Sequence, residues 1–408
     1  MNANGDIIVG LDIGTTNIRV VVGEVTGKDV QIIGFGSHPS NGIRKGVVVN
    51  IEATVASIRK AVEAAERMAG CEINRVYAGI AGDHISGFNS HGLISLKGPE
   101  VTQSDVDRVV ETARSVQIPA DREILHVLTQ EFIVDKNFGI QDPVGMAGVR
   151  LETKIHIVTG AIASAHNVIK CCNKAGLEVV DVVLESLASG DAVLTPEEKE
   201  LGTALIDLGG GTSDLAVFSG NNIRHIFILP LGGNNLTNDI AIGLQAPINE
   251  AERIKIQHGT CIAEEIHPNE VIEIPGMAGR DPKEISRQIL GEIIEARAEE
   301  IFEMLKHEIY RVGMDTHISS GIVLTGGGAL LHRIRELCEF IFGVQVRIGH
   351  PMGIGGLKDV IQVPEYATAV GLVLFGAKQG PKRQSYFQEK NFFSTIIEKI
   401  KAWFNEAF

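Results

Sequence analysis

The sequence predicts an α/β protein built from two similar halves that face each other across a cleft. Two stretches, residues 7–22 and 203–218, each contain an apolar strand, a glycine-rich polar turn and a second strand rich in β-branched residues. This pattern is typical of a hairpin. Asp12 and Asp207 end the first strand of each hairpin and lie nearly half a chain length apart. The spacing indicates a duplicated unit rather than a short repeat.

Composition excludes several classes of protein. The chain has 408 residues, a hydrophobic fraction of 44% and a formal net charge of −14. The apolar content predicts a folded chain of two domains or one bilobed fold. A chain with this negative charge repels phosphate backbones, and a nucleic-acid binder is therefore not expected.

The chain shows no signal for export or for membrane spanning. No apolar run approaches the ~20 residues of a membrane span, and the polar first residues do not form a secretory signal. The five cysteines include no C-x-x-C pair, so neither a disulfide framework nor a structural zinc site is expected. These features predict a soluble intracellular protein with reduced thiols.

The region from 84 to 160 predicts a compact unit inserted into the first half. Its pattern is strand, helix, strand, strand, and Ser104 with Asp107 resembles a capping box at the start of the helix. The expected elements are strands at 85–96, 123–134 and 150–162 and a helix that ends at Arg114.

Two further elements are expected in the second half. Residues 282–312 have apolar side chains at helical spacing and predict one long helix with a charged outer face. Residues 322–329 read as a strand followed by a glycine turn, and helical spacing resumes at 330–337. A glycine turn before a helix is a natural site for a polar ligand.

The glycine turns predict a polyphosphate site of a particular kind. The chain contains neither a P-loop motif nor a G-x-G-x-x-G that opens a helix, so P-loop and dinucleotide folds are not supported. Glycine lets backbone N–H groups approach anionic oxygens closely. Asp12 and Asp207 stand where they could hold the water shell of Mg²⁺. The residues expected to cradle the phosphates are Gly14, Thr15, Thr16, Asn17, Gly209, Gly210, Gly211 and Thr212.

These motifs resemble the superfamily of actin, sugar kinases and heat-shock ATPases. The resemblance implies a duplicated ribonuclease-H-type fold with two phosphate motifs, an adenosine motif and two connecting helices, at 182–189 and 364–371. It implies a catalytic or water-orienting role for Glu185. The residues that it assigns to the nucleoside are Glu252, Lys255, Gly326, Gly327 and Gly328.

Within this superfamily the chain resembles the FtsA family of bacterial division proteins. The resemblance rests on residues 42–51, on residues 76–82 and on a cleft loop at 230–241 that contains Gly233, taken as part of the nucleotide site. It implies ATP binding with at most weak hydrolysis, filaments, membrane attachment, and a complex with the tubulin-like protein FtsZ and with downstream division proteins. It places the FtsZ tail on residues 231–306, where Arg297 is the expected contact.

The C-terminal end predicts a membrane-targeting helix after a linker at 380–391. On a helix the large apolar residues fall on one face, and charged residues fall on the other. The stretch from Phe392 to Phe404 rises about 18 Å at ~1.5 Å per residue. This is too short for a ~30 Å span, so the helix should lie in the membrane interface. The apolar face comprises Phe392, Phe393, Ile396, Ile397, Ile400, Trp403 and Phe404.

Two alternatives share the expected fold. One is a PilM-like pilus-assembly adaptor, and the other is a small-molecule kinase, which would need a base beside a substrate hydroxyl. The expected organisation is a first lobe at 1–83, completed by 161–198 and about 349–379; an inserted subdomain at 84–160; a second lobe at 199–230, completed by 307–348; its outer subdomain at 231–306; and the terminal helix at 392–408.

Overall fold

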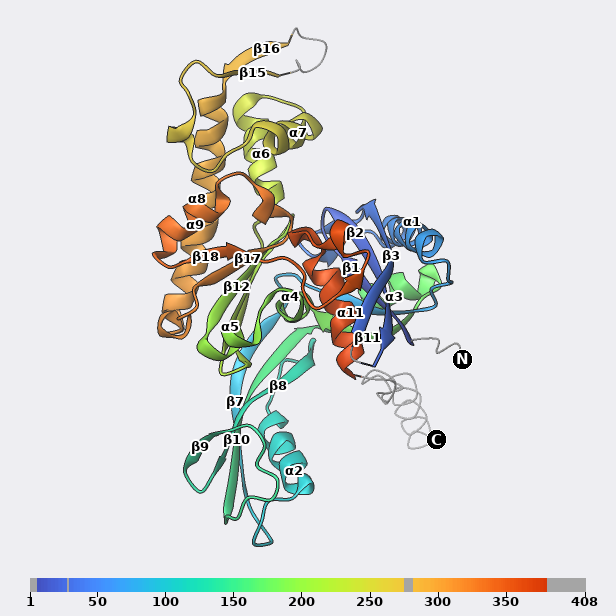
Figure 1. Ribbon diagram of the computed structural model, residues 1–408, viewed down its shortest axis with the longest axis vertical. Helices are drawn as coiled ribbons and strands as arrows, with labels where there is room; N and C mark the ends of the chain where they lie inside the picture. Colours follow the sequence, from blue (N-terminus) through green and yellow to red (C-terminus); the bar gives the residue numbers. More distant parts are fainter. Residues whose placement is uncertain (1–5, 28, 275–281, 380–408) are drawn as a thin grey trace, which may run out of the picture.

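The computed structural model describes residues 6–27, 29–274 and 282–379, and it contains two lobes and an inserted subdomain (Figure 1). Each lobe is organised around one mixed sheet. The inserted subdomain extends from the junction of the lobes at one end of the molecule, and the helices of the second lobe extend at the other. The linker and the terminal helix expected at 380–408 lie outside the described residues.

The two lobe sheets have the same topology, so the predicted duplication is confirmed. In the first lobe, β1, β2 and β3 form an antiparallel meander, and β6 and β11 add in parallel beside β1. In the second lobe, β12, β13 and β14 form the meander, and β17 and β18 add in parallel beside β12. Both sheets therefore place the turn of their first hairpin at the end of a strand that is paired on both sides.

The first lobe contains the capped helix α1 and the strands and helices around it. Helix α1 begins after Asn50, whose side chain accepts from Ala53 N–H, and ends at Gly70 in the left-handed conformation that favours glycine. The first-lobe elements are β1 Asp6–Ile13, β2 Asn17–Thr26, β3 Asp29–Pro39, β4 Ile43–Arg44, β5 Val47–Val48, α1 Ile51–Ala69, β6 Arg75–Ile80, α3 Ile162–Ala175, β11 Glu178–Leu184, α4 Glu185–Val193, β19 Gly355–Gly356, α10 Lys358–Ile361, the 3-10 helix η5 Pro364–Tyr366 and α11 Ala367–Gln379.

The second lobe packs α8 and α9 against its sheet, with Phe302 fully buried in the shared core. Helices α6 and α7 and the β15–β16 hairpin lie at the outer end (Figure 1). Its elements are α5 Pro196–Leu201, β12 Thr203–Leu208, β13 Ser213–Ser219, β14 Asn222–Leu229, α6 Gly233–Leu244, α7 Ile248–His258, η1 Ala263–Glu265, β15 Val271–Ile274, β16 Lys283–Ser286, α8 Arg287–Arg311, η3 Asp315–His317, β17 Ile322–Thr325, η4 Gly327–Leu330, α9 Ile334–Phe342 and β18 Val346–Ile348.

The inserted subdomain is a four-stranded sheet with one helix, and two details of its prediction are wrong. The capping box is made by Thr102 and Asp105 rather than by Ser104 and Asp107, because the side chain of Asp105 returns to the Thr102 backbone N–H at 3.1 Å. A fourth strand, β9, pairs with β8. The elements are β7 Ser86–Ser95, α2 Gln103–Arg114, β8 Arg122–Val134, β9 Asn137–Ile140 and β10 Arg150–Ala161.

Two expectations for the second half also need correction. The long helix begins at Arg287, because residues 283–286 pair with β15 as a strand and the Ser286 side chain accepts from Gln288 N–H. The third glycine turn leads into a short 3-10 helix, and α9 starts only at Ile334. A pattern of apolar residues does not reveal that the residues before a helix pair with a neighbouring strand instead of forming its first turn.

Helices α4 and α11 cross between the lobes at very close range. A Cβ added to Gly371 on α11 would lie 1.9 Å from the Ala188 carbonyl oxygen on α4, and one added to Gly10 on β1 would lie 2.3 Å from the Ala369 carbonyl oxygen. Only glycine fits such contacts, because any side chain would overlap backbone atoms. The two connecting helices are thereby held together where the lobes meet.

No helix of residues 6–27, 29–274 and 282–379 is long and apolar enough to cross a membrane. The boundaries between the lobes, the outer subdomain, the linker and the terminal helix stay predictions of the sequence.

We expect Gly371→Ala to lower the free energy of unfolding by about 1–3 kcal/mol, because the new methyl group forces α4 and α11 apart. Urea unfolding followed by circular dichroism measures the change. Gly98→Ala is the matched control, since the nearest atom to a Cβ there is 3.9 Å away. Equal losses in the two variants would contradict the close crossing.

Candidate nucleotide site

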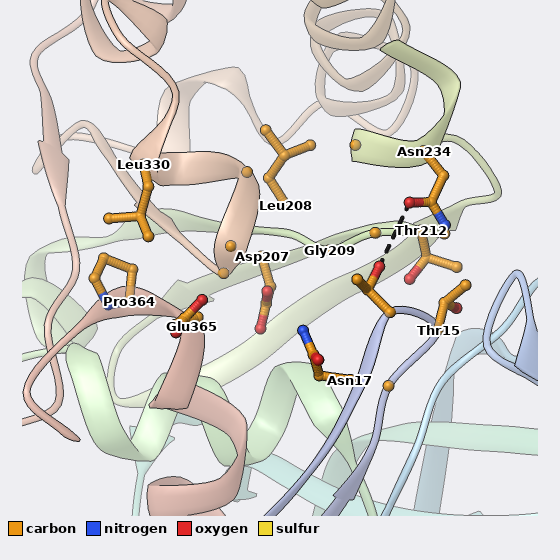
Figure 2. A pocket seen from close by; sticks show the side chains of 18 of the residues that line it. Thr15, Asn17, Asp207, Leu208, Gly209, Thr212, Asn234, Leu330, Pro364 and Glu365 are labelled. Carbon is orange, nitrogen blue, oxygen red and sulfur yellow. Dashed lines mark hydrogen bonds between the residues drawn. The ribbon is translucent and has the colours of Figure 1, made fainter. Parts of the chain in front are cut away.

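A cavity of about 430 Å³ lies between the two lobes. Figure 2 shows Asp207 and Asn17 within it, with Thr15 and Thr212 toward one end and Leu330 and Pro364 toward the other. Its walls contain every residue that the sequence assigned to phosphates, cation and nucleoside. These are Asp12, Gly14, Thr15, Thr16, Asn17, Glu185, Asp207, Gly209, Gly210, Gly211, Thr212, Gly233, Glu252, Lys255, Gly326, Gly327 and Gly328.

The two hairpin turns touch each other across the cavity. A Cβ on Gly210 would lie 1.9 Å from Thr16 Oγ1, and one on Gly211 would lie 2.5 Å from Thr15 Oγ1. Thr16 Oγ1 also donates to Asn234 Oδ1 at 3.5 Å. Hydroxyl groups of one lobe therefore face bare backbone of the other, an arrangement that suits an anion held from both sides.

The start of α6 completes the second turn. Gly233 N–H donates to the Gly209 carbonyl oxygen at 2.9 Å, and Asn234 N–H donates to the Gly210 carbonyl oxygen at 2.8 Å. Residues 230–241 were expected as a cleft loop, but they are helical from Gly233 onward, and these bonds attach the start of that helix directly to the glycine turn. A movement of the turn must therefore move the start of α6.

Four carboxyl groups gather behind the turns. In the register of the first hairpin Asp12 stands opposite Arg19, and in the second Asp207 stands opposite Asp214. Glu185, the first residue of α4, also faces the cavity. The duplication thus puts equivalent positions of the two lobes side by side, with one arginine and several acids.

Burial raises the pKa of each of these acids. The pKa of Asp12 rises to about 7, opposed by the Arg19 charge and increased further by Asp207. The pKa of Asp214 rises to about 8, mainly through burial and then through Asp207. Burial, and then Asp12, raises the pKa of Glu185 well above its ordinary value. Without a ligand, part of this cluster is therefore protonated near neutral pH.

Asp207 is held by two hydroxyl groups. Ser189 Oγ donates to Asp207 Oδ2 at 2.6 Å, and Thr368 Oγ1 donates to the same oxygen at 3.2 Å. Burial raises the pKa of Asp207, while these two bonds lower it. Ser189 lies on α4 and Thr368 on α11, so both connecting helices orient one carboxylate of the second lobe.

The acidic cluster fits a hydrated divalent cation. Among residues 6–27, 29–274 and 282–379, no three histidine, cysteine or acidic side chains converge closely enough to hold a metal ion directly. Asp214 Oδ1 is nevertheless buried without a hydrogen-bond partner among the described residues. Hard carboxylate oxygens and an unsatisfied acceptor suit Mg²⁺, which often keeps several water ligands.

The side of the cavity that the sequence assigned to the nucleoside is built from α7 and the third glycine turn. Lys255 Nζ lies 2.7 Å from Glu252 Oε2, 3.1 Å from the Gly233 carbonyl oxygen and 2.9 Å from Thr237 Oγ1. Gly326 has a φ of 82°, and a Cβ there would lie 2.3 Å from Asp207 Oδ1. Exposed apolar side chains of Ile256 and Leu330 line the same part of the cavity.

Sequence reasoning predicted Lys255 but missed a second basic group of this site, Arg19. Arg19 lies on β2, lines the cavity, and pairs with Glu365 Oε2 at 3.1 Å. Its guanidinium also lies 5.4 Å from the centre of the Tyr366 ring. Counting residues around the first turn would have placed Arg19 opposite Asp12, but Glu365 and Tyr366 arrive from far along the chain.

Arg297, the expected partner contact, does not line the cavity. Its guanidinium on α8 pairs with Asp239 Oδ2 at 2.5 Å and also pairs with Glu300. Both acids raise the pKa of Arg297, with the Asp239 hydrogen bond as the largest cause. An incoming carboxylate would have to compete with these two groups, so its role stays a prediction.

Comparison with known proteins identifies the family. The family model "Cell division protein FtsA" matches residues 204–371, and the model "SHS2 domain inserted in FTSA" matches residues 82–159. "Cell division protein FtsA" of Pseudomonas aeruginosa is 44% identical over 407 residues, which cover 98% of each chain. The protein of the same name from Escherichia coli is 39% identical over 413 residues, again covering 98% of each. The chain belongs to the FtsA family of cell division proteins.

Solved structures show that this FtsA-family chain has an actin-like fold. The "PilM-PilN type IV pilus biogenesis complex" matches with a TM-score of 0.64 and 17% identity, covering 91% of this chain and 98% of that one. MreB5 of Spiroplasma citri bound to AMPPNP matches with a TM-score of 0.54 and 16% identity, covering 91% and 96%. At these identities the likeness concerns the fold alone, so the resemblance to PilM does not favour a pilus adaptor over a division protein.

The raised pKa of Asp214 predicts a pH-dependent stability. The unfolded chain releases this proton above an ordinary pKa of 3.8, whereas the ligand-free folded state keeps it to about pH 8. The free energy of unfolding should therefore fall as pH rises, by about 3–4 kcal/mol between about pH 5 and about pH 8. Asp214→Asn should flatten this slope in urea titrations. Asp359→Asn, at an exposed site, is the control and should leave it unchanged.

Proposed function

We propose that this FtsA-family chain binds ATP with Mg²⁺ in the interlobe cleft, assembles into filaments and tethers FtsZ to the inner face of the cytoplasmic membrane. The observation that carries the proposal is the meeting of two glycine turns from duplicated lobes in front of a buried acidic cluster. In this role the protein would also recruit downstream division proteins to the septum.

Each part of the cleft has a task toward the nucleotide. The turns at 14–17 and 209–212 hold the phosphates with backbone N–H groups and threonine hydroxyls. Asp12 and Asp207 orient the water shell of Mg²⁺, whose charge offsets that of the phosphates and the acids. Glu252 and Lys255, with the turn at 326–328, hold the nucleoside. The related fold of MreB5 bound to AMPPNP supports a nucleotide here.

Glu185 limits any hydrolysis. Burial raises its pKa well above the ordinary value, which favours the protonated form, and a protonated carboxyl is not a base. It becomes competent only when a bound cation lowers its pKa. A carboxyl that spends much of its time protonated is consistent with weak turnover, in which the nucleotide acts as a switch for assembly.

Membrane attachment is proposed from the sequence of residues 392–404, which lie outside the described residues. A short amphipathic helix binds the membrane interface reversibly, since each large apolar side chain contributes at most roughly 1.5–3 kcal/mol. A filament carries many such helices and gains avidity from them. Filament assembly would therefore decide whether the protein stays on the membrane.

The FtsZ tail is proposed to bind the outer part of the second lobe, residues 231–306. This part contains α6, α7 and α8, and Arg297 lies between Asp239 and Glu300 on its surface. Arg297 could exchange one of these intramolecular acids for a carboxylate of the partner. The inserted subdomain at 84–160 is proposed to take part in self-association.

We expect Gly210→Val to abolish ATP binding in the presence of Mg²⁺, because its side chain would fill the contact between Gly210 and Thr16. Isothermal titration calorimetry measures the affinity. Lys255→Ala keeps the turns intact and should weaken binding about tenfold through lost contacts to the nucleoside. Gly98→Val is the control. Unchanged affinity in both cleft variants would refute the assignment of the cleft.

Deleting residues 388–408 should abolish co-sedimentation with anionic phospholipid vesicles, because the apolar face of 392–404 is lost. FtsZ added to the mixture should then remain in the supernatant, whereas with the full chain it should pellet. Trp403→Glu is a milder second variant and should weaken sedimentation, since it charges the apolar face. Unchanged pelleting after the deletion would show that another part of the chain binds lipid.

A further inference from the structure

Strand β8 of the inserted subdomain contacts both lobes. Strands β7, β8 and β10 run from the region of α2 up to the junction of the lobes (Figure 1). Although the subdomain is connected by the chain only to the first lobe, β8 packs against β11 of the first lobe and β14 of the second. Any change in the angle between the lobes must therefore strain or move β8.

The first contact joins β8 to the start of α4. Leu184 N–H donates to His126 Nε2 at 3.0 Å. Because β11 is the outermost strand of its sheet, this bond satisfies a donor that lacks a neighbouring strand on that side. Burial lowers the pKa of His126 to about 4, so the ring is neutral and Nε2 can accept. Leu184 is the cap residue of α4, and Glu185 follows it into the cleft.

The second contact joins β8 to the edge of the second lobe. Gln130 Nε2 donates to the Ile223 carbonyl oxygen at 3.0 Å, and Asn222 Nδ2 donates to the Gln130 carbonyl oxygen at 2.9 Å. The side chain of Gln130 is only 4% exposed. Gln130 thus donates to the opposite lobe through its side-chain amide and accepts from it through its backbone carbonyl, and these two bonds fix the distance between β8 and β14.

Two register shifts put these residues in position. The pairing of β8 with β10 skips Gln130 and skips Leu125, which precedes His126. A bulge frees a backbone carbonyl from the ladder and re-aims the neighbouring side chains. At Gln130 that carbonyl accepts from Asn222. The irregularities of β8 thus coincide with its two contacts to the lobes.

Apolar packing links the two contacts. One buried cluster contains Val158 of the inserted subdomain, Leu184 of the first lobe and Ile223 of the second, with Leu125 and Leu128 of β8 packed against it. Close-packed interiors transmit displacement because they have few voids to absorb it. A shift of β14 against β8 should therefore be felt at the start of α4.

We propose that these contacts form a clasp, His126 with Leu184 and Gln130 with Asn222 and Ile223, that couples the orientation of the inserted subdomain to the interlobe cleft. At one end the clasp holds the cap of α4, beside Glu185. At the other it holds β14, whose partner β13 starts directly after the turn at 209–212. For its effect on nucleotide release, the inference rests on the proposed nucleotide function.

The clasp makes His126 a positioning residue that acts through Leu184. It also gives the inserted subdomain, where self-association is proposed, a physical path to the cleft. A partner that tilts the subdomain would pull on β8 and alter how firmly the lobes close. Closure of the cleft would in turn favour one orientation of the subdomain, since such coupling is reciprocal.

Hydrogen exchange of the full-length, nucleotide-free protein tests the coupling without any ligand. Gln130→Ala and Asn222→Ala should each speed hydrogen exchange about fivefold in the peptide 184–190, because each removes one buried hydrogen bond of the clasp. This peptide belongs to the first lobe, whereas Asn222 belongs to the second. Gln103→Ala removes a side-chain amide from α2 of the same subdomain and is the control. Faster exchange confined to β8 and β14 would overturn the inference.

Nucleotide release tests the functional consequence. His126→Phe should speed dissociation of a fluorescent ATP analogue with Mg²⁺ about fivefold. His126→Gln offers an acceptor oxygen to Leu184 N–H, so its dissociation rate should remain closer to that of the unsubstituted protein. Equal release from all three proteins would overturn the coupling to the cleft. If the unsubstituted protein binds no analogue, the proposed nucleotide function fails, and the exchange result still decides whether the clasp exists.

Discussion

The burial of several carboxyl groups between two lobes is the constraint on which the rest of the structure depends. Asp12, Asp207 and Glu185 line the cleft, and Asp214 stands opposite Asp207 in the strand register. Burial raises the pKa of all four acids. Charges gathered in this way are costly unless a cation, a proton or a hydrogen bond offsets them. Arg19, Ser189 and Thr368 offset part of the cost, and a hydrated cation beside a polyphosphate would offset the remainder.

The same constraint explains why the lobes must meet so closely. Glycine at the turns lets Thr15 and Thr16 of the first lobe approach the backbone of the second. Glycine at the crossing of α4 and α11 lets the connecting helices pass almost in backbone contact. Both connecting helices supply hydroxyl groups to Asp207. The crossing of α4 and α11 is therefore bonded directly to the acidic cluster. A ligand that changes the charge of the cluster therefore acts directly on the elements that set the angle between the lobes.

The inserted subdomain adds a third body to this two-lobed arrangement. Through β8 it reaches the cap of α4 on one side and the edge of the second-lobe sheet on the other. If the chain self-associates as proposed, such a bridge would allow contacts between neighbouring copies to influence the cleft. The hydrogen bonds that make the bridge are few and buried, so single substitutions are sufficient to examine it.

The sequence by itself determined the duplication, the two glycine turns and the inserted subdomain, because each rests on local strand and turn chemistry in a fixed order. The family followed from the resemblance of its motifs to known proteins. The cavity contains every residue that the sequence assigned to phosphates, cation and nucleoside. Element boundaries were predicted less accurately. Residues 283–286 were expected in the long helix but form β16, and the capping box of α2 lies two residues before its expected position. Only the tertiary structure decided that Arg19 pairs with Glu365, that Asp214 joins the acidic cluster and that Gln130 bonds to Asn222. These partners lie far apart along the chain or depend on strand register, and composition and periodicity encode neither.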